Sequence, residues 1–454
     1  MIGKKIYNLC KIIFPYNRSL TGNGNRTTLN ILKKYCPKLK TKEVPSGTKV
    51  FDWVIPKEWN VKEAWIKGPD NKKFADFSKN NLHLVGYSKK IKKKISLKNL
   101  EKKLYYLKKQ PRAIPYVTSY YKEDWGFCIS YKMRKKLRHG QYTINIDSEL
   151  KKGHLTYGEI LIPGKIKKEI FLSTYICHPS MANNETSGIC VTIFLAKWLL
   201  SKKRKFSYRI VFLPETIGSI TYLNKYHKIM KKNIIAGFNI TCVGDNRSYS
   251  YLPSRLGSTI ADKVGLHVLK WTDKNFKKYS WLDRVSDERQ YCSPGIDLPV
   301  VSIIRTKPGA YKEYHTSLDD LNNVVSSKGL EGGYNVIKNA IEALENNCIP
   351  TVNFCCEPHL SKYFAIKVSS DLGNTAMEYQ SLRSLSKNTI PKSKLYPSIL
   401  MPWKNPPKGL SSVRRVTFLP NLPSSYAPIR TARLLPINMV SPIISYCINP
   451  NFRT

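Results

Sequence analysis

Between about residues 150 and 350, apolar strand patterns alternate with helical patterns, and this alternation restricts the fold more than any other feature of the chain. Strand-like runs at 169–176, 209–213 and 234–242 are separated by helical patterns at 187–200 and 220–230. The alternation predicts βαβ units, and hence an α/β fold with a mainly parallel, mixed sheet flanked by helices. Ligand sites in such sheets lie beyond the carboxyl ends of the strands, so residues that follow these runs are the site candidates.

The rest of the chain divides into regions of different composition. A length of 454 residues exceeds the roughly 250–300 residues that one core usually serves, so we expect more than one domain. Residues 47–150 contain short strand-like runs at 50–56, 64–66 and 82–87, which predict a small β-rich domain. Residues 369–454 hold 11 of the 27 prolines, so we expect a divergent, poorly ordered tail or a shifted reading frame.

The formal net charge of +45 is the strongest compositional signal. Such a charge is typical of proteins that bind nucleic acid, anionic lipid or acidic polysaccharide. However, lysine far outnumbers arginine and accompanies many Asn, Ile and Tyr, as an AT-rich coding sequence would produce at surface positions. The lysine runs at 89–94 and 202–205 fit solvated faces better than binding stripes, so charge alone assigns no partner and does not favour nucleic acid.

Simple patterns argue against three classes of protein. No run of about 18 apolar residues occurs, so we expect no transmembrane segment and a soluble, cytoplasmic protein. The 11 cysteines are scattered and form no CxxC pair, which argues against both a disulfide framework and a zinc ribbon.

Residues with metal-binding or acid–base chemistry follow the predicted strands. A histidine, an amide and a carboxylate follow the first strand, single carboxylates follow the second and third, and a second histidine lies farther along the chain. The candidates, in chain order, are His178, Asn184, Glu185, Glu215, Asp245 and His315.

Each candidate alone has a structural alternative. A lone histidine is often a satisfied polar group, Asp245 could be a turn residue beside Gly244, and Asp319 and Asp320 could cap a helix. Consecutive strand ends of a parallel sheet converge in space, however, and two histidines with two or three carboxylates suit metal-dependent hydrolysis. The residues by themselves leave both interpretations open.

These motifs resemble those of the co-catalytic zinc aminopeptidases. The resemblance rests on His178, the Ala-Asn-Asn-Glu-Thr-Ser-Gly run at 182–188, the Pro-Glu pair at 214–215, and the run at 314–320. It is closest to the branch encoded among bacterial polysaccharide-biosynthesis genes, and it covers roughly residues 10–368. In that branch a small β-rich domain is inserted in the peptidase-like domain, which implies a discontinuous domain of 1–46 and 151–368 around an insert of 47–150.

The resemblance also implies roles for single residues. His178 and His315 match the histidine ligands, and Glu215 matches the general base. Asn184 stands where the family has the Asp that bridges two zincs, and Thr216 where it has a second Glu ligand. Because a neutral amide bridges two dications poorly, we expect one zinc rather than two, with Asp245, or else Glu185, as the carboxylate ligand.

The sequence therefore predicts a zinc-dependent, aminopeptidase-like amide hydrolase in surface polysaccharide biosynthesis. The substrate implied is a small molecule of peptide or amino-sugar character, and the oligomeric state is left open. The alternative is a catalytically impaired binding protein of the same fold, which recognises acidic glycan or nucleic acid through its basic surface.

Overall fold

The computed structural model describes residues 1–347, so the tail expected at 369–454 lies outside the described part. Residues Met1–Ala340 form one compact unit. Its larger sheet has eight strands in the order β1-β10-β12-β11-β13-β16-β14-β15. In that order the strands are Lys40–Pro45, His154–Ile162, Phe206–Leu213, Ile166–Tyr175, Ile234–Asn239, Val300–Ile304, Ser250–Leu252 and Lys277–Lys278.

The centre of this sheet is parallel and its flanks are mixed. Strands β12, β11, β13 and β16 pair in parallel, whereas β10 runs antiparallel to β12, and β14 antiparallel to β16. Helices α1 (Ile2–Ile13), α2 (Asn23–Tyr35), α5 (Ser187–Leu199), α6 (Ile217–Asn233), α7 (Ile260–Thr272) and α9 (Ser327–Glu345) accompany it. The predicted α/β class with a mainly parallel sheet is confirmed.

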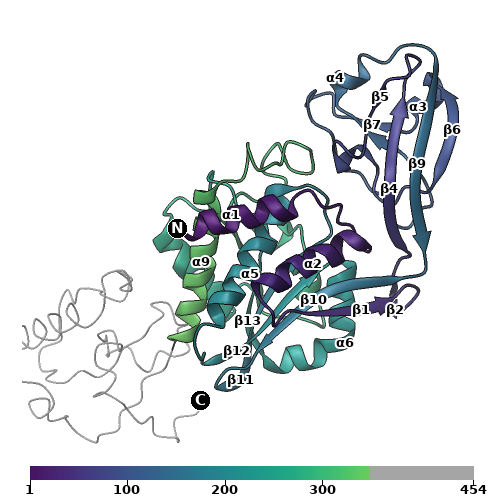
Figure 1. The fold of residues 1–454 in the computed structure, drawn as a ribbon. Coiled ribbons are helices and arrows are strands. Elements are labelled where there is room, and N and C mark those ends of the chain that lie inside the picture. Colours follow the sequence, from purple (N-terminus) through teal and green to yellow (C-terminus); the bar gives the residue numbers. More distant parts are fainter. Residues whose placement is uncertain (348–454) are drawn as a thin grey trace, which may run out of the picture. The chain divides into compact units, whose positions relative to one another are not determined.

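The order in which strands are added to the sheet reverses at β11, although these strands stay parallel. From β11 the chain passes through α5 to β12 on one side, and from β12 through α6 to β13 on the other side of β11. Because parallel crossovers are right-handed, crossovers in opposite directions place their helices on opposite faces, as Figure 1 shows for α5 and α6. A crevice for ligands is therefore expected beyond the carboxyl end of β11.

Helix α5 is buried on all sides because it lies between the sheet and helices α1 and α2 (Figure 1). Its residues from Ser187 to Ala196 are all buried, which explains why its sequence is apolar throughout rather than amphipathic. At Gly188 a Cβ atom would lie 2.4 Å from the carbonyl oxygen of Ile240, so glycine is required for this close approach. The tight packing fixes the first turn of α5 against β13.

A second sheet has four antiparallel strands in the order β5-β4-β9-β6. These strands are Lys73–Phe74, Glu58–Lys67, Gln141–Lys151 and Ile91–Ser96. Short elements surround them: β2 (Lys49–Val50), β3 (Trp53–Val54), α3 (Leu97–Glu101), β7 (Leu104–Tyr105), β8 (Phe127–Cys128) and α4 (Tyr131–Arg134). We call residues 58–151 the small β module, and the domain boundaries drawn from the sequence stay predictions.

One predicted strand is not formed. The strand expected at 82–87 is instead a 3-10 turn at Asn81–His83 followed by isolated bridges at Leu84 and Gly86. Its apolar side chains pack inward without a continuous ladder. In the described part of the chain, no helix is both long and apolar enough to cross a membrane.

Candidate functional site

The turn after β11 carries His178 and is held by hydrogen bonds from across the site. Residues Ala182–Thr186 form one π-helical turn before α5, a feature that often marks functional sites. The backbone N–H groups of Asn183 and Asn184 donate to Asp319 Oδ1 at 2.7 Å and Oδ2 at 2.9 Å. Asp319 therefore acts as a structural anchor of this turn, 135 and 136 residues away in sequence, rather than as the cap of a helix that follows it.

His178 is oriented by a buried ion pair. Its Nδ1 atom lies 3.0 Å from Glu185 Oε2, and the other oxygen of Glu185 accepts from Arg18 Nε at 2.7 Å. The pKa of His178 is raised because the hydrogen bond and charge of Glu185, with the charge of Glu215, outweigh the lowering effect of burial. With Nδ1 engaged in this way, Nε2 faces Glu215, whose Oε2 lies 3.7 Å away.

His315 brings a second imidazole to the same place. Its ring centroid lies 5.4 Å from that of His178, and its ring stacks on Tyr314 at 3.9 Å. Its Nε2 atom is buried and has no hydrogen-bond partner in the described residues. Burial, together with the charge of His178, lowers the pKa of His315 to about 3, so its imidazole stays neutral near pH 7.

Glu215 stands at the end of β12 and borders both the histidine and a second carboxyl group. Its Oε1 atom accepts from Ser286 Oγ at 2.8 Å, and burial raises its pKa. Asp287 Oδ1 accepts from the N–H of Thr216 at 2.7 Å, while its buried Oδ2 has no partner in the described residues. Burial and then the charge of Glu215 raise the pKa of Asp287 to about 8.

Strained backbone collects around this site. Four non-glycine residues that follow strands or flank the histidines have left-handed φ angles: Ser180 at 42°, Thr216 at 63°, Cys242 at 48° and His315 at 54°. Each such conformation costs roughly 1–3 kcal/mol and persists only when its surroundings enforce it. No local sequence signal predicts these angles, because glycine is absent from all four positions.

The small β module forms one wall of the site. Backbone hydrogen bonds run from Tyr116 N to His315 O at 2.9 Å and from Ser317 N to Ile114 O at 2.8 Å. The ring of Tyr116 packs against His178 and His315, with centroid distances of 5.2 and 5.3 Å. Sequence reasoning missed Tyr116, because residues 116 and 315 are distant in the chain and carry no shared motif.

The structure brings only some of the predicted residues together. His178 lies near both of the others: its ring centroid is 5.4 Å from that of His315, and its Nε2 atom is 3.7 Å from Glu215 Oε2. The carboxylate of Asp245 instead accepts four hydrogen bonds, two of them at 2.9 Å and 3.0 Å from the N–H groups of Arg247 and Thr306. Side-chain donors supply the other two, Asn183 Nδ2 at 2.9 Å and Thr306 Oγ1 at 2.7 Å.

The other two candidate ligands are engaged as well. Asn184 Oδ1 accepts from the hydroxyl of Tyr175 at 2.8 Å, and both oxygens of Glu185 are held by Arg18 and His178. Ligand atoms of Cys177, His178 and Glu185 lie within 4.8 Å of one another. Burial raises the pKa of Cys177 well above its usual value, and Glu185 is already engaged by Arg18 and His178.

The two imidazoles fit a zinc ion. A zinc-binding histidine commonly donates its second ring N–H to a carboxylate, which is the relation of His178 to Glu185. The buried, unpartnered Nε2 of His315 is a neutral donor atom of the kind that zinc prefers.

Comparison with known proteins agrees with the fold and the motifs. The family model described as a domain of unknown function, DUF4910, matches residues 7–347. A provisionally named polysaccharide biosynthesis protein with aminopeptidase-like domain from Clostridium acetobutylicum is 43% identical over 361 residues, covering 79% of this chain and 82% of that protein.

Solved structures give the same picture. The crystal structure of a provisionally named peptidase from Clostridium acetobutylicum aligns with a TM-score of 0.77 at 42% identity, covering 80% of this chain and 86% of that one. BSAP, a zinc aminopeptidase from Bacillus subtilis, aligns with a TM-score of 0.55 at 12% identity, covering 75% and 94%. At 12% identity the second likeness shows the fold alone, and it confirms the zinc aminopeptidase-like fold predicted from the motifs.

Proposed function

The chain belongs to the DUF4910 family, and from this premise we propose that it is a zinc-dependent amide hydrolase of the aminopeptidase type. The observation that carries the proposal is the position of His178, whose Nε2 lies 3.7 Å from Glu215 Oε2 and whose ring lies 5.4 Å from that of His315. The buried Nε2 of His315 has no hydrogen-bond partner in the described residues. The name of the Clostridium acetobutylicum relative supports a substrate in polysaccharide biosynthesis, and the aminopeptidase-like fold supports an amide bond.

The residues have distinct tasks in such a reaction. His178 and His315 would hold zinc, which supplies Lewis acidity when bound at a site of this kind. Glu215, whose pKa is raised by burial, accepts a proton from the attacking water and returns it to the leaving amine as the C–O bond forms and the C–N bond breaks. Ser286 keeps one oxygen of Glu215 in place, so that the other faces His178.

One observation favours the alternative of a catalytically impaired binding protein. The positions of the bridging carboxylate and of the second glutamate ligand are Asn184 and Thr216, which are both neutral. The side-chain oxygen of Asn184 is already bound by Tyr175. Such a protein would keep this fold without hydrolysis and would recognise acidic glycan or nucleic acid through its basic surface.

Metal analysis of the purified chain tests the proposal. We expect about one zinc per chain, lost in His178→Ala and His315→Ala because each removes one donor atom. Glu215→Gln should keep the zinc and lose amide hydrolysis by about 10²–10⁴-fold, since it removes the proton acceptor but keeps the shape. A chain that binds no zinc and is unaffected by either histidine substitution would exclude the enzyme, and full function in Glu215→Gln would favour the binding protein.

A further inference from the structure

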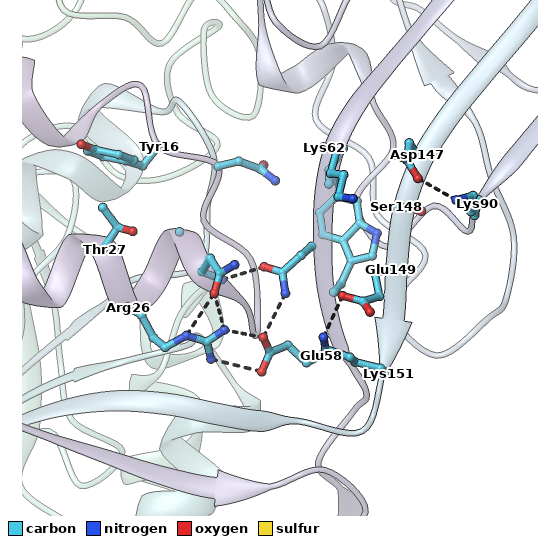
Figure 2. Close-up of a pocket in the computed structure, with 16 residues that line it drawn as sticks. Tyr16, Arg26, Thr27, Glu58, Lys62, Lys90, Asp147, Ser148, Glu149 and Lys151 are labelled. Carbon is cyan, nitrogen blue, oxygen red and sulfur yellow. Dashed lines mark hydrogen bonds and ion pairs between the residues drawn. The ribbon is translucent and has the colours of Figure 1, made fainter.

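A second cavity lies between the first turn of α2 and strands β4 and β9 (Figure 2). It encloses about 710 Å³, which is within the range of roughly 300–1,000 Å³ that ligand pockets occupy. None of the site residues described above lines it. Tyr16, Asn17 and Thr27 line it from the side of α2, and Glu58, Asn60 and Lys62 from β4.

Most charges in this cavity are already paired. Arg26 and Glu58 form a two-pronged ion pair (Figure 2). Asn60 Nδ2 also donates to Glu58 Oε1, at 2.9 Å. Lys90 pairs with Asp147 at 2.8 Å, and Lys151 with Glu149 at 2.9 Å. Four cations and three carboxylates therefore leave a small positive excess in this cavity.

The remaining polar groups are free to bind. The hydroxyls of Tyr16 and Thr27, the amide of Asn17 and the ammonium of Lys62 have no hydrogen-bond partner in the described residues. Hydroxyls and amides both donate and accept hydrogen bonds, as the hydroxyls of a sugar do. One wall of the cavity thus offers neutral groups that can both donate and accept hydrogen bonds. The other wall offers the ammonium group of Lys62, which forms no ion pair within the described residues.

This set of groups discriminates between ligand classes. Nucleic acid is held mainly through several lysines and arginines that neutralise phosphates, whereas three of the four cations here are already neutralised. An apolar ligand would leave the free hydroxyls and amides unsatisfied. We propose that the cavity binds a segment of an acidic oligosaccharide, with sugar hydroxyls on Tyr16, Asn17 and Thr27 and one carboxylate on Lys62.

The cavity adjoins the histidine site. Asn17 and Trp59 line both this cavity and a narrow crevice whose far wall includes Tyr116, and the ring of Tyr116 contacts both histidines. That crevice encloses only about 10 Å³, so these shared wall residues are what connects the two, and glycan binding in the cavity does not rest on the proposed function.

Calorimetric titration of the full chain tests the binding with two probes, a glucuronic-acid-containing tetrasaccharide and neutral cellotetraose. We expect the acidic probe to bind more tightly, and Lys62→Gln to weaken it about tenfold by removing a charge-assisted hydrogen bond. The double variant Asn17→Ala with Thr27→Val should weaken both probes. Lys274→Gln, an exposed lysine outside the cavity, is the matched control and should bind as the unmodified chain does.

The outcomes separate this proposal from that of hydrolysis. Equal binding of both probes, or no effect of the cavity variants, would overturn the assignment. Loss of binding in Lys274→Gln to the same extent as in Lys62→Gln would show a general charge effect and would also overturn it. Saccharide binding that persists in Glu215→Gln supports the cavity whether or not amide hydrolysis is found.

Discussion

The α/β part and the small β module contain the same kinds of charged pair in opposite surroundings. In the α/β part the side chains of Arg18 and Glu185 are 0% exposed. In the small β module Lys90 and Asp147 are 72% and 34% exposed. A buried pair stabilises only while it is complete, because removal of one partner leaves an uncompensated charge, whereas an exposed pair competes with water and contributes little. The buried pair of Arg18 and Glu185 is thus held in one geometry.

The largest effect is expected from breaking the buried pair. Arg18→Met leaves Glu185 buried without its cation, so the free energy of unfolding should fall by about 3–5 kcal/mol. Urea unfolding followed by circular dichroism measures this change. A loss below about 1 kcal/mol would mean that solvent reaches the pair and that the contrast with the small β module is wrong.

The next largest effect is expected on zinc binding, because the small β module contributes Tyr116 to the wall of the histidine site. Tyr116→Ala removes the ring that packs on both histidines, and we expect zinc affinity to fall about 10–100-fold, as for other groups that orient metal ligands. Competition with a chelator of known affinity measures it. Tyr116→Phe keeps the ring and loses only the hydrogen bond to Tyr120, so it should bind zinc nearly normally. Unchanged zinc affinity in Tyr116→Ala would show that the small β module does not help to position the two histidines.

A smaller, pH-dependent effect on stability is expected from the ion pair of Arg26 and Glu58, which joins α2 to β4. Burial raises the pKa of Glu58, but hydrogen bonds from Arg26, Asn60 and His154 N outweigh it and lower the pKa from 4.5 to about 2. Because the folded pKa lies below the unfolded one, the pair stabilises the fold above pH 4.5 and the contribution is lost as the pH falls toward 2.

Since solvent reaches Arg26, this contribution should be below about 1 kcal/mol. Urea midpoints between pH 5 and about pH 3 should therefore fall less steeply in Glu58→Gln than in the unmodified chain. Parallel slopes for the two proteins would contradict the assignment.

The smallest effect is expected at the exposed pair. Lys90→Ala should leave the melting temperature unchanged within error, because both partners stay solvated when the pair is broken. Differential scanning calorimetry measures it beside Arg18→Met. A shift as large as that of the Arg18 variant would remove the distinction between the two regions.

Much of the fold was predictable because its signals are local. Apolar runs at 169–176 and 209–213 coincide with β11 and β12, and the apolar pattern at 187–200 coincides with α5. The prediction of a strand at 82–87 was wrong because the apolar residues there are buried in an irregular segment. They pack inward without the continuous backbone hydrogen bonding of a strand.

The sequence by itself determined the parallel sheet, the position of His178 and Glu215 at strand ends, and the membership of both histidines in one motif set. Only the tertiary structure decided which polar groups are free. The carboxylate of Asp245 follows a strand as a ligand would, yet four donors occupy it. One is the N–H of nearby Arg247, and the other three come from Asn183 and Thr306, which are distant in sequence. The wall formed by Tyr116 was likewise invisible, since hydrogen-bond saturation and packing depend on contacts between segments, which no local pattern encodes.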